Sequence, residues 1–414
     1  MSRRWAYPLV ALVCAVPRAV VLAHEGSTIV SGSVEKSALF AQVFVQNGTY
    51  GFIPGEPSAY TQPLYGFFLI PLEWAFGRQS WIGIGGAQIL VAVVVAWLVY
   101  EIGRRLVGPR WAVVAAVVAT LHPYLVWHDV HINREIVDQL CAAALVLLTL
   151  LVAERSTWWL AGALGVVTGL TLLGNSRLVL IPFLCVAYLA VRRVPVLLLV
   201  VVLVGAAVPV MPWLVRNDVN VGCFTLTTDG RSLWKANNPQ TYHLLASHQW
   251  IDNVRRDSPR PPHPGYYTPE EARGFYDRSA GKTILHPDEC LAMNFYEHLA
   301  WKWVRHHPGG KLKVAALSEQ LFWQPTVIET GGSSSGFGKQ VAEPAYMIAL
   351  YLLAAVGLFV TARSFAWLAL ALLAYQSVWA GIFVGATRYR IAFDFLLAVL
   401  ATCALAWLWE RRRA

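Results

Sequence analysis

Long apolar runs are the feature that most limits what this chain can fold into. About ten of them reach or approach the roughly 20 residues that cross a bilayer core as a helix. Only 14% of the 414 residues are charged and 57% are hydrophobic, which is too few charges to cover a soluble globule of this size. The sequence therefore predicts an all-α polytopic membrane protein. The predicted spans are residues 5–23, 82–100, 111–126, 139–153, 158–173, 178–191, 196–215, 346–360, 365–384 and 391–409.

Arginines at the ends of these runs predict which side each connection faces. Placing one set of them in the cytoplasm satisfies the positive-inside rule at every second connection. That set is Arg3, Arg4, Arg104, Arg105, Arg110, Arg155, Arg192, Arg193, Arg363, Arg411, Arg412 and Arg413. Both termini are then cytoplasmic, and the loops at 24–80 and 127–138 are external.

The chain divides into three predicted parts: a transmembrane module over 1–216, an external cap over 217–343 and C-terminal spans over 344–414. In the first loop, residues 37–47 form an amphipathic pattern that Gly48 should end, and residues 64–76 are too short for a full crossing. The cap is expected to be mostly α-helical. Helical patterns cover 269–285 and 288–306, and Pro308-Gly309-Gly310 reads as a break.

The net charge of +9 is partly the orientation signal just described. No basic, aromatic-interleaved soluble domain is present, so nucleic acid is not an expected partner, whereas membrane lipids are. Of the six cysteines, Cys223 and Cys290 share the external segment and could form a disulfide.

Cations also stand on the predicted external face, where the positive-inside rule expects few. They are Arg177, Arg216, Arg388 and Arg390, and the acids Glu35 and Glu135 lie on the same side. A guanidinium can grip two phosphate oxygens, and a carboxylate beside it can move a proton. The pattern indicates a site for an anionic ligand. Each arginine could instead be an anchor paired with lipid headgroups, Asp218 or Asp394.

Residues 212–217 read Pro-Trp-Leu-Val-Arg-Asn and precede Gly222, Thr227-Thr228-Asp229-Gly230 and Asn237-Asn238-Pro239. This run resembles the Pro-Trp-x-x-Arg-Asn segment of bacterial glycosyltransferases with the GT-C membrane fold. These form the clan of protein O-mannosyltransferases and aminoarabinose transferases, glycosyltransferase family 39 and its relatives. Further motifs agree in order: Asn47-Gly48-Thr49-Tyr50, Tyr60-Thr61-Gln62-Pro63-Leu64, His122-Pro123-Tyr124 before Glu135, and Arg388-Tyr389-Arg390-Ile391.

The resemblance implies a GT-C bundle in a bacterial plasma membrane that moves a sugar from a polyprenyl-phosphate donor to an acceptor hydroxyl on the extracytoplasmic face. The acceptor would be a protein, a lipid or a cell-wall glycan, and the anomeric configuration would invert. Because a lipid phosphate leaves as a stable anion, such a site needs cations and one base, not the two carboxyl groups of a glycosidase. The implied roles are Glu35 as base, Glu135 as a second acid that orients the acceptor or a bound ion, and Arg177, Arg216, Arg388 and Arg390 as phosphate ligands. Candidate substrate contacts are Tyr60, His131, Asn217, Asn237 and Tyr389.

A divalent metal is the one cofactor that the sequence leaves open. His128, His131 and Glu135 fall at i, i+3 and i+7, which would place them on one face of a continuous helix, with Asp138 near them. Nitrogen and oxygen ligands at that spacing could hold such an ion. A structural or acid-orienting role explains the same residues and is given more weight.

One departure from the family pattern leaves other functions open. Val34 precedes Glu35 where paired acids are usual, which would suit a divergent acceptor or an inactive glycan- or lipid-binding relative. A transporter or flippase of lipid-linked glycans would share the anion-binding face, but it predicts charges near the middle of the spans. The middles of these spans are nearly free of charge, which favours the enzyme.

Overall fold

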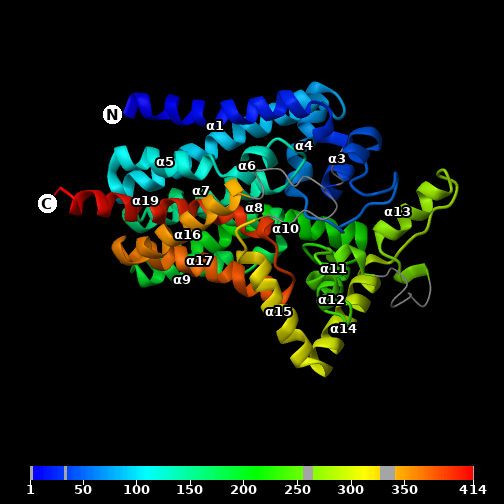
Figure 1. The fold of residues 1–414 in the computed structure, drawn as a ribbon. Coiled ribbons are helices and arrows are strands. Elements are labelled where there is room, and N and C mark those ends of the chain that lie inside the picture. The colour runs from blue at the N-terminus through cyan, green and yellow to red at the C-terminus, as the bar shows by residue number, and fades with distance from the viewer. Residues whose placement is uncertain (1–2, 32–34, 255–263, 327–340, 414) are drawn as a thin grey trace.

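The computed structural model describes residues 3–31, 35–254, 264–326 and 341–413. Across these ranges the backbone is helical, and the one ladder-type pairing is an isolated bridge between Ile53 and Glu56. The long helices run side by side, with both termini at one end and most of the cap helices at the other (Figure 1). The predicted all-α polytopic class is confirmed.

Seven helices of the described chain are long and apolar enough to cross a membrane. They are α1 (Arg3–Glu25), α5 (Trp81–Thr120), α7 (Glu135–Arg155), α10 (Val196–Val221), α16 (Glu343–Val360), α17 (Arg363–Ile382) and α19 (Asp394–Arg411), the last continuing from α18 (Thr387–Arg390) and the turn Ile391–Phe393. Three shorter apolar helices join them: α4 (Leu64–Phe76), α8 (Trp158–Gly174) and α9 (Ile181–Val191), the last entered through the turn Ser176–Leu178.

Two of the predicted spans are joined in α5, and two more correspond to the shorter helices α8 and α9, which together explain the difference from the predicted number. Gly108 breaks the helical path with a φ of 78°, and Pro109 restarts it. The predicted span 111–126 is wrong in its bounds, because α5 ends at Thr120 and a separate α6 (Pro123–His128) follows. Pro123 is favoured at the first position of a helix and disfavours helical geometry in His122 before it, so the chain turns there.

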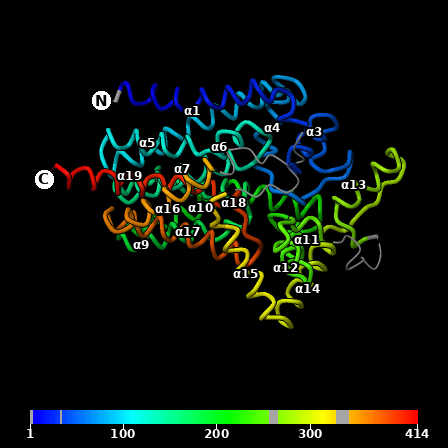
Figure 2. The backbone as a smooth tube through the Cα atoms, viewed as in Figure 1, coloured from blue at the N-terminus to red at the C-terminus, as the bar shows by residue number. Residues whose placement is uncertain are grey.

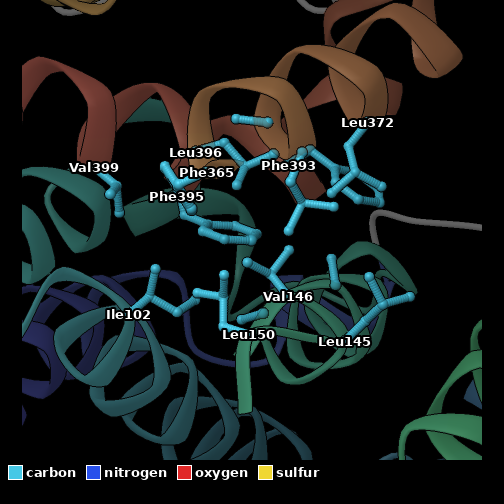
Figure 3. Packing of buried hydrophobic residues seen from close by; sticks show 14 of the residues in the cluster. Ile102, Leu145, Val146, Leu150, Phe365, Leu372, Phe393, Phe395, Leu396 and Val399 are labelled. Carbon is cyan, nitrogen blue, oxygen red and sulfur yellow. The ribbon is translucent and has the colours of Figure 1, made fainter. Parts of the chain in front are cut away.

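The C-terminal helix α19 is the centre of the bundle. Most of its residues are buried, mainly in contact with α5 and α16. Figure 3 shows Phe395, Leu396 and Val399 of α19 packed with Ile102, Val146 and Leu150. Van der Waals packing stabilises helix contacts inside a bilayer, since lipid chains are as apolar as leucine. Close approach is also used: a Cβ on Gly165 of α8 would collide with the carbonyl oxygen of Val202 in α10.

The first loop, which the arginine distribution predicts to be external, has the expected helices. Helix α3 (Lys36–Asn47) ends at Gly48, whose φ of 71° suits glycine, and α4 occupies the predicted range 64–76. A short α2 (Thr28–Ser31) precedes them.

The cap contains α11 (Gly230–Ala236), α12 (Thr241–Ala246), α13 (Pro269–Arg278), α14 (Glu289–His306), α15 (Pro308–Trp323) and the short turns Ile251–Asn253 and Pro264–Tyr266. Helix α13 ends before the predicted 285, because Ala280 and Gly281 both adopt positive φ. Helix α15 was not predicted: Pro308 reads as a break, yet it stands at the helix start, where proline is favourable.

Cys223 and Cys290, whose pairing the sequence left open, form a disulfide with Cα atoms 5.9 Å apart. It joins the segment that follows α10 to the first turn of α14.

Candidate functional site

The turn between α6 and α7 is held by a buried ion pair. Arg18 of α1 lies 2.7 Å from the Asp129 carboxylate and also donates to the carbonyl of Thr120 at 3.0 Å. Gln139 donates to the other Asp129 oxygen at 2.9 Å, and Gln88 donates to the carbonyls of Asp129 and His131. Buried charges persist only when they are paired and hydrogen-bonded. This network therefore fixes where α7 begins.

Glu135 is the first residue of α7 and carries a buried carboxylate. Its side chain is 4% exposed, and its Oε1 lies 3.4 Å from Nε of Arg388. Neither oxygen accepts a hydrogen bond from any described residue. A buried carboxylate without hydrogen bonds is costly, and such groups are rare outside functional sites. The position is suited to a carboxylate that acts on a ligand.

Arg134 adds a second cation to this group. Its Nη1 donates to Oε1 of Gln62 at 2.9 Å, and its Nε has no hydrogen-bond partner among the described residues. Burial would lower the pKa of Arg134, but the carboxylates of Asp138, Glu135 and Glu35 outweigh it, so the pKa is raised and the guanidinium stays charged. These three acids are therefore close enough to interact with one guanidinium.

Arg177, in the turn Ser176–Leu178, and Tyr389, in α18, bring a third guanidinium to the same place. The Arg177 guanidinium lies 4.0 Å from the centroid of the Tyr389 ring, and that of Arg388 lies 5.2 Å from it. Tyr389 thus stands between two cations. The contact holds the two guanidiniums near each other without neutralising either of them.

Glu35 begins α3 and faces this group from the first loop. Its Oε1 accepts from the Ser37 hydroxyl at 3.2 Å, and its side chain is half-buried. The charges of Glu135 and Glu35 both act on Arg388. The structure therefore brings Glu35, Glu135, Arg177, Arg388 and Tyr389 together from parts of the chain far apart in sequence. Val34, where the family pattern has an acid, lies outside the described residues.

An open pocket of about 390 Å³ adjoins Arg388 on the side of the cap. Its lining mixes apolar side chains with groups that can form hydrogen bonds, namely Leu245, His248, Gln249, Trp250, Leu321, Gln324, Gly385, Ala386, Thr387 and Arg388. The Trp250 ring contacts the Tyr389 ring at 6.1 Å. His248 holds a φ of 56°, which non-glycine residues adopt rarely and often at functional sites.

Two of the four predicted phosphate ligands have other partners. Arg216 donates to the carbonyls of Ser58 at 2.8 Å and Tyr50 at 3.0 Å, so it fastens the first loop to α10. Arg390 is fully buried and paired with Asp394 at 2.8 Å. Neither guanidinium is brought to the group around Glu135.

The remaining candidate contacts also have protein partners. Tyr60 is buried, and its hydroxyl lies 3.5 Å from a Glu270 oxygen. Asn217 donates to the Thr225 carbonyl at 2.8 Å, and Asn237 donates to the carbonyls of Leu233 and Ile382. His131 is stacked on Trp127 with ring centroids 3.9 Å apart. Of the candidate contacts named from the sequence, only Tyr389 lies in the charged group.

The residues considered for a metal are not on one helix. His128 ends α6 and Glu135 begins α7, with a turn between them, so the predicted common helical face is wrong. His128 contacts the Asn133 side chain, and burial lowers the pKa of His128 to about 3. Among the described side chains, no three His, Cys, Asp or Glu residues are grouped to hold a metal ion. The acids around Glu135 interact with arginines instead, and this donor set does not fit a metal site.

Arg134, Asp138 and Gln62 join the charged group although no role there was expected for them. Asp138 lies three residues after Glu135 and four after Arg134, so it shares a helical face with each of them. That spacing was the available signal for these two. Gln62 sits inside the Tyr-x-x-Pro motif, but nothing in the sequence indicates that its side chain meets Arg134.

Comparison with known proteins identifies a family over part of the chain. Residues 61–215 match the family described as dolichyl-phosphate-mannose-protein mannosyltransferase. This range includes α4 to α9, the turn before Glu135 and most of α10. No curated protein sequence matches the chain.

Solved structures resemble the whole described fold. The Archaeoglobus fulgidus oligosaccharyltransferase tethered with an acceptor peptide has a TM-score of 0.55 and 14% identity, covering 99% of this chain and 50% of that one. The oligosaccharyltransferase AglB from the same organism, in complex with an inhibitory peptide and a dolichol-phosphate, has a TM-score of 0.54 and 14% identity, covering 99% and 51%. ArnT from Cupriavidus metallidurans, bound to undecaprenyl phosphate, has a TM-score of 0.45 and 14% identity, covering 97% and 78%.

The chain spans about half the length of the archaeal oligosaccharyltransferase structures that it resembles. At this level of identity the likeness concerns the fold, while the family match rests on sequence. The resemblance predicted from the motifs is confirmed: the chain has the fold of the GT-C membrane glycosyltransferases, and its residues 61–215 match the dolichyl-phosphate-mannose-protein mannosyltransferase family.

Proposed function

We propose that this protein transfers a sugar from a polyprenyl-phosphate donor to an acceptor hydroxyl on the extracytoplasmic face of the membrane, with inversion at the anomeric carbon. The observation that carries the proposal is the buried Glu135 carboxylate, which lacks hydrogen bonds and faces Arg388 beside an open pocket. The family description names a dolichyl-phosphate-linked mannose as donor, and one structural relative was solved with a dolichol-phosphate. Both support a lipid-phosphate donor.

The chemistry requires charge compensation more than acid catalysis. The acceptor oxygen forms a bond to the anomeric carbon while the bond from that carbon to the phosphate oxygen breaks, and the electron pair leaves with the phosphate. A base takes the proton of the acceptor hydroxyl. Guanidiniums fixed before the reaction stabilise the leaving phosphate, at little cost in reorganisation.

Arg388 and Arg177 are the proposed phosphate ligands. Their guanidiniums both contact the Tyr389 ring, and Arg388 borders the pocket. Each keeps free donor capacity, because a cation–π contact uses none of the N–H groups. Arg216 and Arg390 have structural roles in this proposal, since each already donates to protein groups.

Glu35 is the proposed base, and Glu135 is proposed to orient the acceptor hydroxyl. Glu35 is half-buried and lies in the first loop, so it can meet both solvent and the charged group. Glu135 is enclosed beside the Arg388 guanidinium, so its carboxylate is held in one place and suits a fixed contact to the acceptor hydroxyl. No step in this proposal uses a metal ion.

Transfer from a panel of radiolabelled polyprenyl-phosphate hexoses and pentoses into native membranes tests the proposal. Wild-type protein should move label into an acceptor fraction, and Glu35→Gln and Arg388→Ala should each reduce transfer by about 100-fold or more. Arg363→Gln, at the exposed start of α17, is the matched control and should remain active. Full activity of folded Glu35→Gln would remove Glu35 as the base.

Binding of an unglycosylated polyprenyl phosphate separates the donor site from the chemistry. Affinity should fall in Arg388→Ala and Arg177→Ala but stay close to wild type in Glu35→Gln, because the base does not touch the phosphate in this scheme. If the wild-type protein does not bind a polyprenyl phosphate at all, the proposed donor class is wrong.

A further inference from the structure

The hairpin of α14 (Glu289–His306) and α15 (Pro308–Trp323) projects to the side of the bundle. Figure 1 shows the two helices forming a V whose apex lies beyond the edge of the bundle, at the end that carries the cap. The tube in Figure 2 follows the same path. The apex is not covered by any other described helix in this direction, and its composition is unusual.

Residues 301–313, which form the apex, are rich in cations and aromatic residues. The sequence Trp-Lys-Trp-Val-Arg-His-His-Pro-Gly-Gly-Lys-Leu-Lys contains two tryptophans, two histidines and four Lys or Arg, without an acid. Trp301 is 49% exposed and Leu312 is 70% exposed. The side chains of Lys302, Arg305 and Lys313 are exposed as well. Apolar and cationic side chains are therefore presented together at one tip.

One lysine of the apex fixes its level relative to the spans. Nζ of Lys311 donates to the carbonyl of Ile382 at 2.8 Å and to Oδ1 of Asn237 at 2.5 Å. Ile382 is the last residue of the span α17. Leu312 and Lys313 follow directly, so the start of α15 lies within the reach of a lysine side chain from the end of this span.

We propose that the apex formed by residues 301–313 is a membrane-surface anchor that binds the headgroups of anionic phospholipids in the leaflet on the cap side. Tryptophan prefers the headgroup level, clustered Lys and Arg are attracted to anionic lipid, and an exposed leucine at that level can enter the acyl boundary. The anchor would hold α15 at the membrane surface. Because Lys311 ties α15 to Asn237 in the cap, it would also limit movement of the cap relative to the bundle.

The charge pattern also favours lipid as the partner. Cations on the side opposite to the predicted cytoplasmic arginines run against the positive-inside rule and call for a local cause. The group around Glu135 does not supply one, because the apex has no part in it. An acidic protein surface would satisfy the charges but not the exposed Leu312 at the end level of a span.

Site-directed spin labelling of the full chain tests this anchor. A nitroxide at Leu312→Cys is compared with one at Lys282→Cys, an exposed residue beyond α13, in nanodiscs of phosphatidylcholine alone or mixed equally with phosphatidylglycerol. The four unpaired cysteines of the native chain are buried. In mixed discs, the ratio of oxygen to nickel-chelate accessibility should be several-fold higher at 312 than at 282.

A charge variant completes the test. The triple variant with Lys302→Gln, Arg305→Gln and Lys313→Gln removes three of the cations. In it, the accessibility ratio at 312 should fall toward the ratio at 282. In discs of pure phosphatidylcholine, the ratio at 312 of the unsubstituted apex should fall by a smaller amount. A ratio at 312 equal to that at 282 in the mixed discs overturns the proposal. A label shielded from both relaxing agents overturns it too, since it indicates contact with protein. His306→Cys offers a second labelled position if Leu312→Cys fails to fold.

Discussion

At the scale of single residues, the site depends on the ion pair of Glu135 and Arg388. The Glu135 side chain is almost fully enclosed, and the Arg388 side chain is 41% exposed. Removing the guanidinium leaves a buried charge with weaker compensation, whereas removing both charges does not. The contribution of this ion pair to stability can therefore be measured separately from its contribution to catalysis.

We expect Arg388→Gln to lower the free energy of unfolding by roughly 1–3 kcal/mol, reduced from the value for a fully buried pair because the arginine is partly exposed. Adding Glu135→Gln should recover much of that stability. Transfer activity should stay lost in the double variant, because the groups that act on the substrate are gone. Thermal melting in detergent and the transfer assay measure the two effects. If the double variant is no more stable than Arg388→Gln alone, the two charges are not coupled.

The buried side chain of His128 should make the folding stability of the protein depend on pH. Burial lowers its pKa from 6.5 to about 3, an effect that Arg388 and His131 reinforce and Asp129 opposes. Between these two values the unfolded chain binds the proton and the folded chain does not, so stability falls as the pH drops from 6.5 toward 3.

The matched measurement is the melting temperature of wild type and His128→Gln between pH 7 and pH 4, where glutamine offers a neutral polar side chain of similar size. Carboxylates titrate in both proteins, so the difference between the two curves isolates the histidine. The wild type should lose more stability over this interval. Parallel curves would show that His128 does not contribute.

How far the sequence predicts the site also depends on single residues. The motifs and the predicted orientation of the spans select the four arginines Arg177, Arg216, Arg388 and Arg390 as candidates. In the structure, Arg177 and Arg388 both contact Tyr389, as expected of residues in one site. The same rule cannot separate them from Arg216 and Arg390, because an arginine at the end of a span can face a ligand or a backbone carbonyl. That choice is made by tertiary contacts, such as those of Arg216 with Ser58 and Tyr50.

At the scale of elements, α3 is tied to the cap by Lys36, the residue after Glu35. Its Nζ lies 3.4 Å from Glu270 of α13 and 3.8 Å from Asp229, the residue that caps α11. Burial would lower the pKa of Lys36, but Asp229, Glu270 and Asp252 outweigh it and the pKa is raised. The lysine is therefore charged, and it fixes the start of α3 and with it the backbone of Glu35.

Lys36→Met should reduce kcat by on the order of tenfold, because a displaced base transfers protons less efficiently, while KM for the donor changes little. Lys36→Arg should restore most of the rate, since it keeps the charge. Lys282→Met, at an exposed site, is the control. Steady-state transfer kinetics separate the two constants. A rise in KM alone, or no rescue by arginine, would contradict a positioning role.

Proline explains where the sequence misplaces elements. Pro308 reads as a break but begins α15, and Pro123 interrupts what looks like one span from 111 to 126. In α10 the opposite holds, because Pro209 and Pro212 lie inside a continuous helix that runs to Val221. A proline marks a place where the hydrogen-bond ladder changes. Whether the helix starts, ends or continues there depends on the neighbouring helices.

At the scale of the whole molecule, a disulfide within the cap ties the segment that leaves α10 to the start of α14. Cys290 is next to Glu289, which accepts from the Thr228 hydroxyl at 2.6 Å and from the Ala59 amide at 3.0 Å. The bond therefore fixes the segment after α10, the start of α14 and the first loop relative to one another. Disulfides persist in oxidising compartments and are rare in the cytosol. The pairing supports the proposed extracytoplasmic position of the cap.

The disulfide gives a joint test of stability and orientation. It closes a loop with a sequence separation of 67 residues, and the chain-entropy model assigns about 4 kcal/mol to a loop of that size. The variant with Cys223→Ser and Cys290→Ser should melt at a lower temperature and be cut more readily by protease within the cap, and reductant should have no further effect on it.

Orientation is read from the cysteines in intact cells. After reduction, a membrane-impermeant maleimide should label Cys223 and Cys290 without lysis, and it should label an introduced Lys282→Cys even before reduction. A cysteine introduced at Arg192, between α9 and α10, should react only after lysis, because the arginine distribution places that connection inside. Labelling at 192 in intact cells, together with protection at 282, would show that the protein has the opposite orientation in the membrane. The proposed site would then face the cytoplasm, where this disulfide would be reduced.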